Sequence, residues 1–409
     1  MTSTTRKGTR PGESLTQSDP GERGEHETDT LLVGADSDQS PVLSVVMPTL
    51  NEEEGVRECI DRIRTAAGKL GVPTEVVVSD SSTDRTPEIA EAAGAIVVEP
   101  DRPGYGYAYR YAFERARGDI IAMGDADTTY DFEELPKLVA ELERTGAEMV
   151  MGSRLDGTIK PGAMPALHEH VGNPLLTGFL NVFYGTEVSD AHSGFRVFTR
   201  DALEAMDLET DGMEFASEMV MAASAADLDV AEVPITYHER EGEETLDSFR
   251  DGWRHVRFML TNAPTYLFAG PGIGAFVFGV LLLLFAVTGT AVFGRSFGVN
   301  SMIAGSVFAI VGTHAVALAV FSRVAGRTIG QPTDPVTTFL VEHVSVERGV
   351  GAGLALFVAG VGYALYLVWT WAGSGFSVVP PTTQSLLACL GIILGLQTVF
   401  SSFFLSVIE

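Results

Sequence analysis

Apolar runs alternate with amphipathic stretches between about residue 42 and residue 240. Five short runs are rich in β-forming residues: LSVVMP, TEVVVSD, AIVVEP, DIIAMGD and AEMVMGS. Because helical patterns separate these runs, the sequence predicts an α/β fold with a mainly parallel sheet covered by helices. In such sheets ligands bind beyond the carboxyl ends of the strands, so functional side chains are expected just after the runs.

The end of the chain follows a different pattern. No charged residue occurs from Phe258 to Gly294, and the core GIGAFVFGVLLLLFAVTGTAVF exceeds the roughly 20 apolar residues needed to cross a bilayer. Three more apolar segments follow at about 301–321, 350–371 and 385–407. Buried helices of a soluble protein are the alternative for any one segment, but four in succession favour an α-helical transmembrane domain of four helices.

Two further segments complete the predicted organisation. The first 40 residues are polar and rich in Gly, Ser, Thr and charge, which predicts a disordered tail. The stretch LDSFRDGWRHVRFML places Phe249, Trp253, Val256 and Leu260 on one stripe beside arginines, which predicts an amphipathic helix in the membrane interface. The predicted parts are a tail at 1–40, a soluble domain at 41–240, an interfacial helix at 241–263 and a transmembrane domain at 264–409.

Charge is distributed unevenly along the 409 residues. The formal net charge is −27, and all of the excess lies in residues 1–265. Only four lysines stand against 23 arginines, and phosphate-binding surfaces need clustered positive charge, so a nucleic-acid partner is excluded. The surplus suits a protein kept soluble at high salt, with an ordinary acidic domain as the alternative. The two cysteines, Cys59 and Cys389, provide no disulfide or zinc framework, which indicates a reducing compartment.

The arginines near the apolar segments predict an orientation. They occur before the first segment and after the second, namely Arg250, Arg254, Arg257, Arg323, Arg327 and Arg348, whereas the other two loops contain only Arg295. Because positively charged loops stay on the cytoplasmic side, the protein is expected in the cell membrane with its large domain facing the cytoplasm.

The run DIIAMGDADTTYD ends in two aspartates, Asp125 and Asp127. Side chains at i and i+2 of an extended chain lie on one face, so these carboxylates repel each other unless a positive charge lies between them. A divalent cation is the natural candidate. The same spacing recurs at Asp36 and Asp38, so the spacing alone does not decide the matter.

Two earlier strand ends carry polar side chains as well. SVVMPTLNEEE ends its strand at Pro48 and then presents Thr49, Asn51 and Glu52. VVVSDSSTDRT ends at Asp80, and Asp84 follows. These groups could accept hydrogen bonds from a nucleotide base and ribose, although capping of turns is the alternative for both aspartates.

Two helical stretches supply further candidates. Gly104 and Gly106 open a helix in PGYGYAYRYAFERARGD, where backbone amides could approach a phosphate, or where the glycines could simply form a structural loop. Glu214 and Glu218 in GMEFASEMVMAA lie on one helical face, either in a site or as solvated charges.

Five motifs occur in a characteristic order: PTLNEEE, DSSTDRT, GDADTTY, GSRL and DAHSGFRVF. In this order the chain resembles the family-2 inverting glycosyltransferases of the GT-A fold, over about residues 42–260. It is most similar to the polyprenyl-phosphate (dolichol-phosphate) sugar synthases. The resemblance implies a Rossmann-like GT-A domain at 41–240 that transfers a hexose from a UDP- or GDP-sugar to a polyprenyl or dolichyl phosphate with inversion. The product would feed surface glycan or protein glycosylation.

The resemblance also implies roles for residues on the donor side. Asp80 and the turn from Pro48 to Glu52 would hold the nucleotide. From their positions in the sequence, Asp84, Gly104 and Gly106 are also assigned to the donor side. Asp125 and Asp127 would hold Mg²⁺ or Mn²⁺ on the diphosphate, and oxygen ligands suit such a hard cation. In the mannosyl branch a glutamine often stands where this chain has Thr129, which leaves the third ligand and the sugar open.

On the acceptor side, a lipid phosphate is already an oxyanion, so it needs positioning more than a strong base. The arginine fork suits this task. By resemblance Arg154 in GSRL is the best phosphate ligand, with Arg196 and Arg240 as further candidates that could instead pair with local carboxylates. The helix with Glu214 and Glu218 would border the acceptor, and one of the two would bind sugar hydroxyls or orient a reacting group.

Two other functions compete with this interpretation. A processive polysaccharide synthase would normally carry Gln-Xaa-Xaa-Arg-Trp after the acceptor helix, and the sequence has no such motif. A lipid flippase or transporter fused to a sugar-binding module would need ionisable groups within the membrane, where His314 is nearly alone. Anchoring and lipid capture are therefore favoured for the apolar segments.

Overall fold

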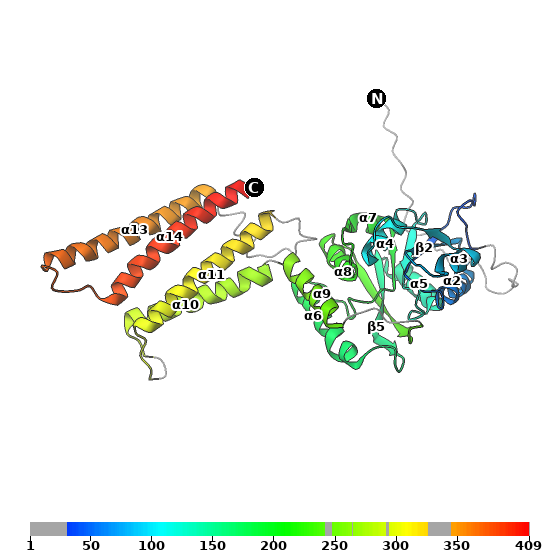
Figure 1. The fold of residues 1–409 in the computed structure, drawn as a ribbon, viewed down its shortest axis with the longest axis horizontal. Helices are drawn as coiled ribbons and strands as arrows, with labels where there is room; N and C mark the ends of the chain where they lie inside the picture. Colours follow the sequence, from blue (N-terminus) through cyan, green and yellow to red (C-terminus); the bar gives the residue numbers. More distant parts are fainter. Residues whose placement is uncertain (1–30, 242–247, 264, 292–293, 326–344, 409) are drawn as a thin grey trace, which may run out of the picture. The chain divides into compact units, whose positions relative to one another are not determined.

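The computed structural model describes residues 31–241, 248–263, 265–291, 294–325 and 345–408. The predicted tail up to residue 30, Arg327 and the side chains of Phe249 and Arg250 lie outside the described residues. The chain divides into two compact units, Met1–Phe258 and Met259–Glu409 (Figure 1).

The first unit is built on one seven-stranded sheet in the order β3-β2-β1-β4-β6-β5-β7. Its strands are β1 (Leu43–Thr49), β2 (Thr74–Asp80), β3 (Ile96–Val98), β4 (Ile120–Met123), β5 (Met149–Ile159), β6 (Arg196–Thr199) and β7 (Val230–Tyr237). β6 runs antiparallel to β4 and β5, while the other pairings are parallel. The mainly parallel α/β sheet is thus confirmed, as are its five predicted strands.

β6 and β7 were not among the predicted strands. β6 has only four residues, and β7 contains Pro234, which argues against a central strand when only the sequence is read. The structure resolves the conflict by placing β7 at the edge of the sheet, where a missing N–H donor is tolerated.

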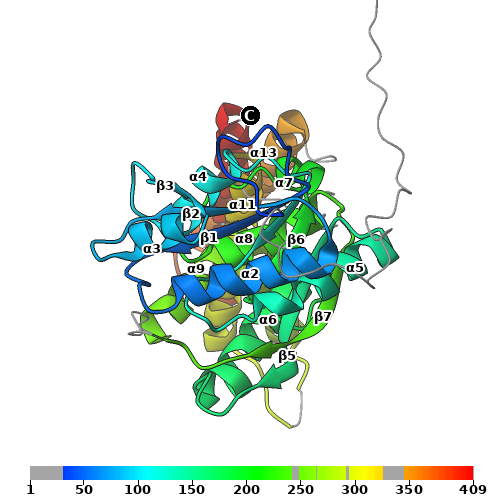
Figure 2. The same cartoon turned by 90° about the vertical axis from the view of Figure 1, so that its right-hand side faces the viewer.

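Helices cover both faces of the sheet, and Figure 2 shows α2 and α5 crossing one of them. The helices of this unit are α2 (Val56–Leu70), α3 (Thr86–Ala92), α4 (Tyr105–Phe113), α5 (Leu135–Thr145), α6 (Asn173–Tyr184), α7 (Arg200–Met206) and α8 (Phe215–Ala225). α9 (Ser248–Asn262) follows β7 in the chain and lies in the stretch predicted to be an interfacial helix, and its Trp253 is 60% exposed. Placement of α9 in a membrane interface stays a prediction.

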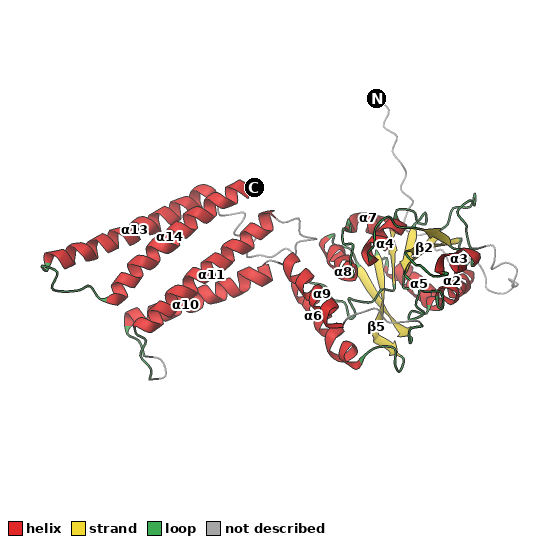
Figure 3. Ribbon diagram, in the orientation of Figure 1, coloured by secondary structure: helices red, strands yellow, loops and turns green. Residues whose placement is uncertain are grey.

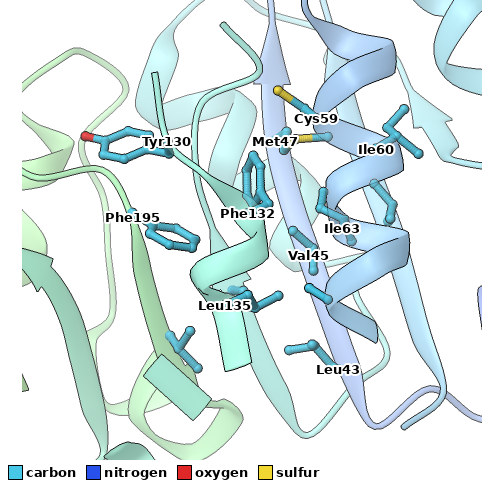
Figure 4. Close-up of a cluster of buried hydrophobic side chains, with 14 of the residues drawn as sticks. Leu43, Val45, Met47, Cys59, Ile60, Ile63, Tyr130, Phe132, Leu135 and Phe195 are labelled. Atoms are coloured by element: carbon cyan, nitrogen blue, oxygen red, sulfur yellow. The ribbon is translucent and has the colours of Figure 1, made fainter. Parts of the chain in front are cut away.

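The sheet alternates its side chains between two apolar layers. Leu43, Val45 and Met47 of β1 pack with Ile60 and Ile63 of α2 (Figure 4). On the other face the rings of Phe113, Phe198 and Phe215 pack together, with Phe113 and Phe198 centroids 5.6 Å apart. Each large apolar side chain buried in this way contributes roughly 1.5–3 kcal/mol, so the two layers hold the strand ends rigidly.

Residues at the end of the predicted tail are ordered against the sheet. Leu32 forms a bridge with Thr74, and the Val33 amide donates to the Thr74 carbonyl at 2.8 Å. Val33 is buried. The prediction of a disordered tail through residue 40 is therefore wrong for these two residues, whose apolar side chains extend the core.

The described residues of the second unit form four long helices, which can be followed in Figure 3. They are α10 (Gly270–Thr288), α11 (Val299–Ala325), α13 (Val346–Gly373) and α14 (Thr382–Ile408). By length and composition all four can cross a membrane, over Leu267–Thr288, Val299–Val324, Val346–Gly373 and Thr382–Val407. The four predicted membrane helices are thus confirmed, and exposed apolar side chains such as Val407 (80%) suit contact with lipid.

Glycines lie where these helices touch. A Cβ atom on Gly279 of α10 would lie 2.6 Å from the carbonyl oxygen of Gly305 on α11. Between α13 and α14, a Cβ on Gly360 would lie 2.7 Å from the amide nitrogen of Ile392. Small residues at these positions let the backbones approach closely, as expected for helices that associate in lipid.

Candidate active site

The loops after β1 and β2 meet at the carboxyl edge of the sheet because the two strands are paired along their full length, with Thr49 opposite Asp80. The Thr49 hydroxyl donates to Asp80 Oδ1 at 2.7 Å. The Ser82 hydroxyl donates to the same oxygen at 2.7 Å, and the Ser82 amide donates to Oδ2 at 3.2 Å. Asp80 is 6% exposed, so its carboxylate is held rigidly at the rim of the sheet.

The turn after Pro48 is joined to the second loop through its polar side chains. Asn51 has a backbone φ of 59°. Its side-chain Oδ1 accepts from the Thr83 backbone amide at 2.9 Å, and its own backbone amide donates to Ser82 Oγ at 2.7 Å. The Glu52 amide donates to the Thr86 hydroxyl oxygen at 2.9 Å.

Asp84 holds the start of α3. Its Oδ1 accepts from the amide and the hydroxyl of Thr86 at 3.0 and 2.6 Å. Although burial opposes it, these hydrogen bonds lower the pKa of Asp84 below its usual range. Turn capping, the alternative noted from the sequence, accounts for these two contacts, and Oδ2 also accepts from the Glu53 amide at 3.4 Å.

Asp125 and Asp127 follow β4 at the same edge but have different surroundings. Asp127 Oδ1 accepts from the Thr129 hydroxyl at 2.5 Å and from the Thr129 amide at 3.2 Å, while its Oδ2 lies 3.3 Å from Nη1 of Arg240. Asp125 Oδ1 accepts from the Tyr105 hydroxyl at 2.8 Å. One carboxylate is thus turned toward a cation and the other toward the phenol of Tyr105.

Negative charge is concentrated here. Burial and the Asp127 charge together raise the pKa of Asp125 to about 6, against the Tyr105 hydrogen bond and Arg240, which lower it. Burial also raises the pKa of Glu52 to about 7, with Arg240 opposing and Asp127 reinforcing the shift. Three interacting carboxyl groups thus lie around one guanidinium, an arrangement that attracts further cations.

The donor set fits a hard divalent cation. Within the described residues, no group of three His, Cys, Asp or Glu side chains is arranged to hold a metal alone. Mg²⁺ and Mn²⁺ sites for nucleotides commonly use one or two carboxylates and complete their shell with phosphate oxygens and water. Asp127 supplies such an oxygen, which already faces Arg240. Thr129, which stands in place of the glutamine, fixes the Asp127 carboxylate through its hydroxyl.

Gly104 and Gly106 let α4 pack closely against the loop before α8. Gly104 has φ 144°, a conformation that side chains rarely allow, and a Cβ on either glycine would meet backbone oxygens of residues 210 and 211. The amides of Gly106 and Tyr107 donate to the Asp211 carbonyl at 3.0 and 3.2 Å. The Gly106 amide already has a partner, which favours the structural-loop interpretation for this glycine, while a phosphate role for Gly104 stays a prediction.

Two of the predicted phosphate-binding arginines have partners inside the domain. Nε and Nη2 of Arg154 donate to Asp190 at 2.7 and 2.8 Å. Despite burial, Asp190 holds the pKa of Arg154 well above its usual range. Arg196 is fully buried and donates to the carbonyls of Ser193 and Ala191, both at 2.9 Å. Arg196 thereby braces the loop of the DAHSGFRVF motif.

The two glutamates of the α8 segment are separated in role. Glu218 is fully buried, and its carboxylate accepts from the amides of Glu209 and Thr210 at 2.7 and 2.9 Å. Burial raises the pKa of Glu218, against these amides. Glu214 lies 3.5 Å from Nε of Arg254 on α9. The geometry gives Glu218 a supporting role for the loop at 209–210.

The sequence reasoning missed Tyr105 beside Asp125, and it also missed a partly buried polar cluster elsewhere in this unit. Tyr105 carried a weak signal, because tyrosines are unusually dense after the glycine pair. The Ser217 hydroxyl lies 3.2 Å from Nε2 of His192 and 3.0 Å from Nδ1 of His255. Burial lowers the pKa of His192 to about 3, so its ring is neutral. No sequence spacing links these three residues, which come from a loop, α8 and α9.

A helix-covered, mainly parallel sheet with paired aspartates at its carboxyl edge, in one chain with four apolar helices, defines the class of membrane-bound, GT-A-like glycosyltransferases. The chain matches the sequence profile of glycosyl transferase family 2 over residues 44–207 and that of the glycosyltransferase family 2 C-terminal transmembrane region over residues 320–409. The protein belongs to glycosyltransferase family 2 and is an enzyme.

Similar proteins share much of this chain. The low-salt glycan biosynthesis hexosyltransferase Agl6 of Haloferax volcanii is 57% identical over 380 residues, covering 93% of this chain and 92% of that protein. A dolichyl-phosphate hexose transferase of the same organism is 36% identical, covering 51% of this chain and 89% of that protein. A glucosyl-3-phosphoglycerate synthase from Mycobacterium tuberculosis, solved with Mn²⁺ and UDP, is 26% identical over 55% of this chain and 80% of its own, with a TM-score of 0.43.

Proposed function

We propose that the protein transfers a hexose from a UDP- or GDP-sugar to a polyprenyl or dolichyl phosphate, with inversion, giving a lipid-phosphate-sugar for surface glycan or protein glycosylation. The observation that carries the proposal is the combination, in one chain, of the paired aspartates at the sheet edge and four helices long and apolar enough to span a membrane. The relatives named above support it, since one is a hexosyltransferase of glycan biosynthesis and another uses dolichyl phosphate by name.

On the donor side, Asp80 and the turn Pro48–Glu52 would bind the base and ribose, because their oxygens line the rim where β1 and β2 end. Asp84 would contribute indirectly, because it holds Thr86 and the start of α3 beside these loops. Asp125 and Asp127 would hold Mg²⁺ or Mn²⁺. Such a cation, when bound, neutralises the charge that develops on the departing nucleoside diphosphate. Thr129 and Tyr105 keep the two carboxylates oriented toward it.

In the reaction an oxygen of the lipid phosphate forms a bond to the anomeric carbon, while the bond from that carbon to the nucleoside diphosphate breaks and its electron pair leaves with the diphosphate. Attack from the opposite side inverts the centre. Arg154 uses Nε and Nη2 for Asp190, which leaves Nη1 as its nitrogen for the lipid phosphate. Pairing with Asp190 holds the guanidinium in place for this single contact.

The catalytic unit is proposed to face the cytoplasm, where nucleotide sugars are made. The arginine distribution supports this orientation, because Arg254, Arg257, Arg323 and Arg348 all flank the same predicted side of the spans. The four helices would anchor the enzyme and present the lipid.

The test uses membranes that contain the full chain, incubated with radiolabelled UDP- and GDP-hexoses and Mg²⁺ or Mn²⁺. We expect label in an organic-extractable lipid that is labile to mild acid. Asp127→Ala should abolish the metal-dependent transfer, with a loss on the order of a thousandfold, whereas Asp38→Ala in an exposed Asp-Xaa-Asp stretch should retain it. Label recovered only in polymer, or transfer unchanged in Asp127→Ala without divalent ions, would contradict the proposal.

A further inference from the structure

Arg240 lies among the carboxylates of the candidate donor site. Its Nη2 forms an ion pair with Glu52 Oε1, and its Nη1 lies 3.3 Å from Asp127 Oδ2. Asp127 Oδ1 is already engaged by Thr129, so the guanidinium contacts the carboxylate oxygen that remains for a metal. The Arg240 side chain is 26% exposed, and its Nε is buried without a hydrogen-bond partner in the described part of the chain. The side chain is therefore held by charge rather than by a full set of hydrogen bonds.

The backbone around Arg240 is fastened to the same loop. The His238 amide donates to the Thr129 carbonyl at 2.9 Å, and the Glu241 amide donates to the Asp127 carbonyl at 3.2 Å. Tyr237 forms an isolated bridge with Tyr130. Because these contacts fix the main chain on both sides of Arg240, only its side chain is free to move relative to Asp127.

We propose that Arg240 is an internal counter-cation of the donor site, which pairs with Glu52 and occupies the place of the divalent ion beside Asp127 until the nucleotide sugar brings that ion in. The inference rests on the proposed function and adds an order of binding to it. Arg240 and a divalent cation compete for one oxygen, Asp127 Oδ2, and like charges at that distance repel. The metal therefore binds weakly to the free enzyme.

A nucleoside diphosphate changes this balance. Its oxygens bring negative charge that Asp127 and Glu52 alone do not supply, so the site then accommodates the divalent ion and Arg240 together. The released guanidinium fork has a diphosphate beside it, a partner that it can bind through two nitrogens. Arg240 is thus a positioning residue that makes the metal affinity depend on bound nucleotide. It prevents Mg²⁺ from occupying the site before the nucleotide binds.

The experiment measures Mn²⁺ binding to the full-length, detergent-solubilised protein by the electron paramagnetic resonance signal of free Mn²⁺, with and without UDP or GDP. Arg240→Gln is compared with wild type, with Arg240→Lys, which retains the charge, and with Arg144→Gln. Arg144 pairs with Glu141 on the surface of α5 and provides the same change in net charge. Thermal unfolding of each variant reports whether it is folded, and Arg240→Lys supplies the comparison should Arg240→Gln not fold.

Without nucleotide, Arg240→Gln should bind Mn²⁺ roughly tenfold more tightly than wild type, while Arg144→Gln should match wild type. With nucleotide the difference should shrink. If Arg240→Gln does not fold, the inference requires that nucleotide raise the Mn²⁺ affinity of Arg240→Lys as it does for wild type, and an affinity independent of nucleotide in both overturns it. Equal or weaker Mn²⁺ binding by Arg240→Gln, with nucleotide-dependent binding and lipid labelling intact in wild type, overturns the inference alone. Absence of Mn²⁺ binding in every variant with either nucleotide overturns it together with the metal site of the proposed function.

Discussion

At the scale of single residues, the two aspartates of the GDADTTY motif are chemically identical and structurally different. Asp127 is fixed by Thr129 and faces Arg240, whereas Asp125 is partly exposed and accepts a hydrogen bond from the Tyr105 phenol. Burial and Asp127 raise the pKa of Asp125 to about 6, so its charge at neutral pH depends on the hydrogen bond from Tyr105. The burial of Tyr105 and the nearby Asp125 charge hold its own pKa well above the usual range, which keeps the phenol a donor.

Tyr105→Phe should therefore weaken metal binding at low pH. The hydrogen bond from Tyr105 lowers the pKa of Asp125, so its loss raises that pKa further above about 6 and leaves more of the carboxyl protonated at pH 7. We expect the pH midpoint of nucleotide-dependent Mn²⁺ binding to move upward by on the order of one unit. The measurement is a Mn²⁺ titration between pH 5 and pH 8.

Tyr107→Phe is the matched control for this change. It lies on the same helix and removes one hydroxyl, but that hydroxyl donates to Asp101 and not to Asp125. Its midpoint should equal that of wild type. A midpoint that moves downward in Tyr105→Phe, or equally in both variants, would show that the phenol does not tune Asp125.

At the scale of elements, the local sequence predicts where each strand ends but not which distant segments of the chain pack beside that end. Asp80, Asp125 and Asp127 follow long apolar runs, and parallel strands bring such ends to one edge, so their proximity could be predicted. Arg240 reaches Asp127 only because β7 pairs with β5, and β7 was obscured by its proline. The Arg154–Asp190 pair depends likewise on long-range contacts. Charge alone could not identify Asp190 as the partner of Arg154, because the chain has 54 acidic residues.

Two glycine-to-alanine substitutions on α13 should change the stability of the membrane helices in opposite directions. Gly360→Ala should destabilise the α13–α14 contact by roughly 1–3 kcal/mol, because its Cβ would meet the backbone of Ile392 at 2.7 Å. Gly362→Ala, two residues on, has nothing within 4 Å and should be neutral or stabilising by roughly 0.5–1 kcal/mol from helix propensity. Thermal unfolding in detergent, followed by circular dichroism, measures both, and a stabilising Gly360→Ala would refute the close approach.

At the scale of the whole molecule, acidic charge and apolar surface are separated along the chain. The excess negative charge lies in residues 1–265, while the four spans carry exposed apolar side chains. An acidic unit of this kind would remain soluble in concentrated salt, and screening by that salt would reduce its self-repulsion. Composition alone predicts this division, which the two compact units parallel.

The proposed orientation can be tested by labelling cysteines introduced into a Cys389→Ser background with a maleimide that does not cross membranes. Ser296→Cys, in the loop between α10 and α11, should be labelled in intact cells. Asp36→Cys, in the first unit, should be labelled only after lysis. The reverse pattern would place the catalytic unit outside the cell.

The bonds from His238 and Glu241 to the loop of Thr129 and Asp127 have a practical consequence for anyone wishing to crystallise the catalytic unit by itself. A fragment that ends at Tyr237, the last residue of β7, would retain all seven strands of the sheet. It would lose the His238 and Glu241 amides that bind the loop of Thr129 and Asp127, and it would lose the Arg240 guanidinium. Such a truncated protein would carry a cluster of carboxylates without the Arg240 charge. Its measured affinity for cations would therefore reflect the truncation and not the intact enzyme.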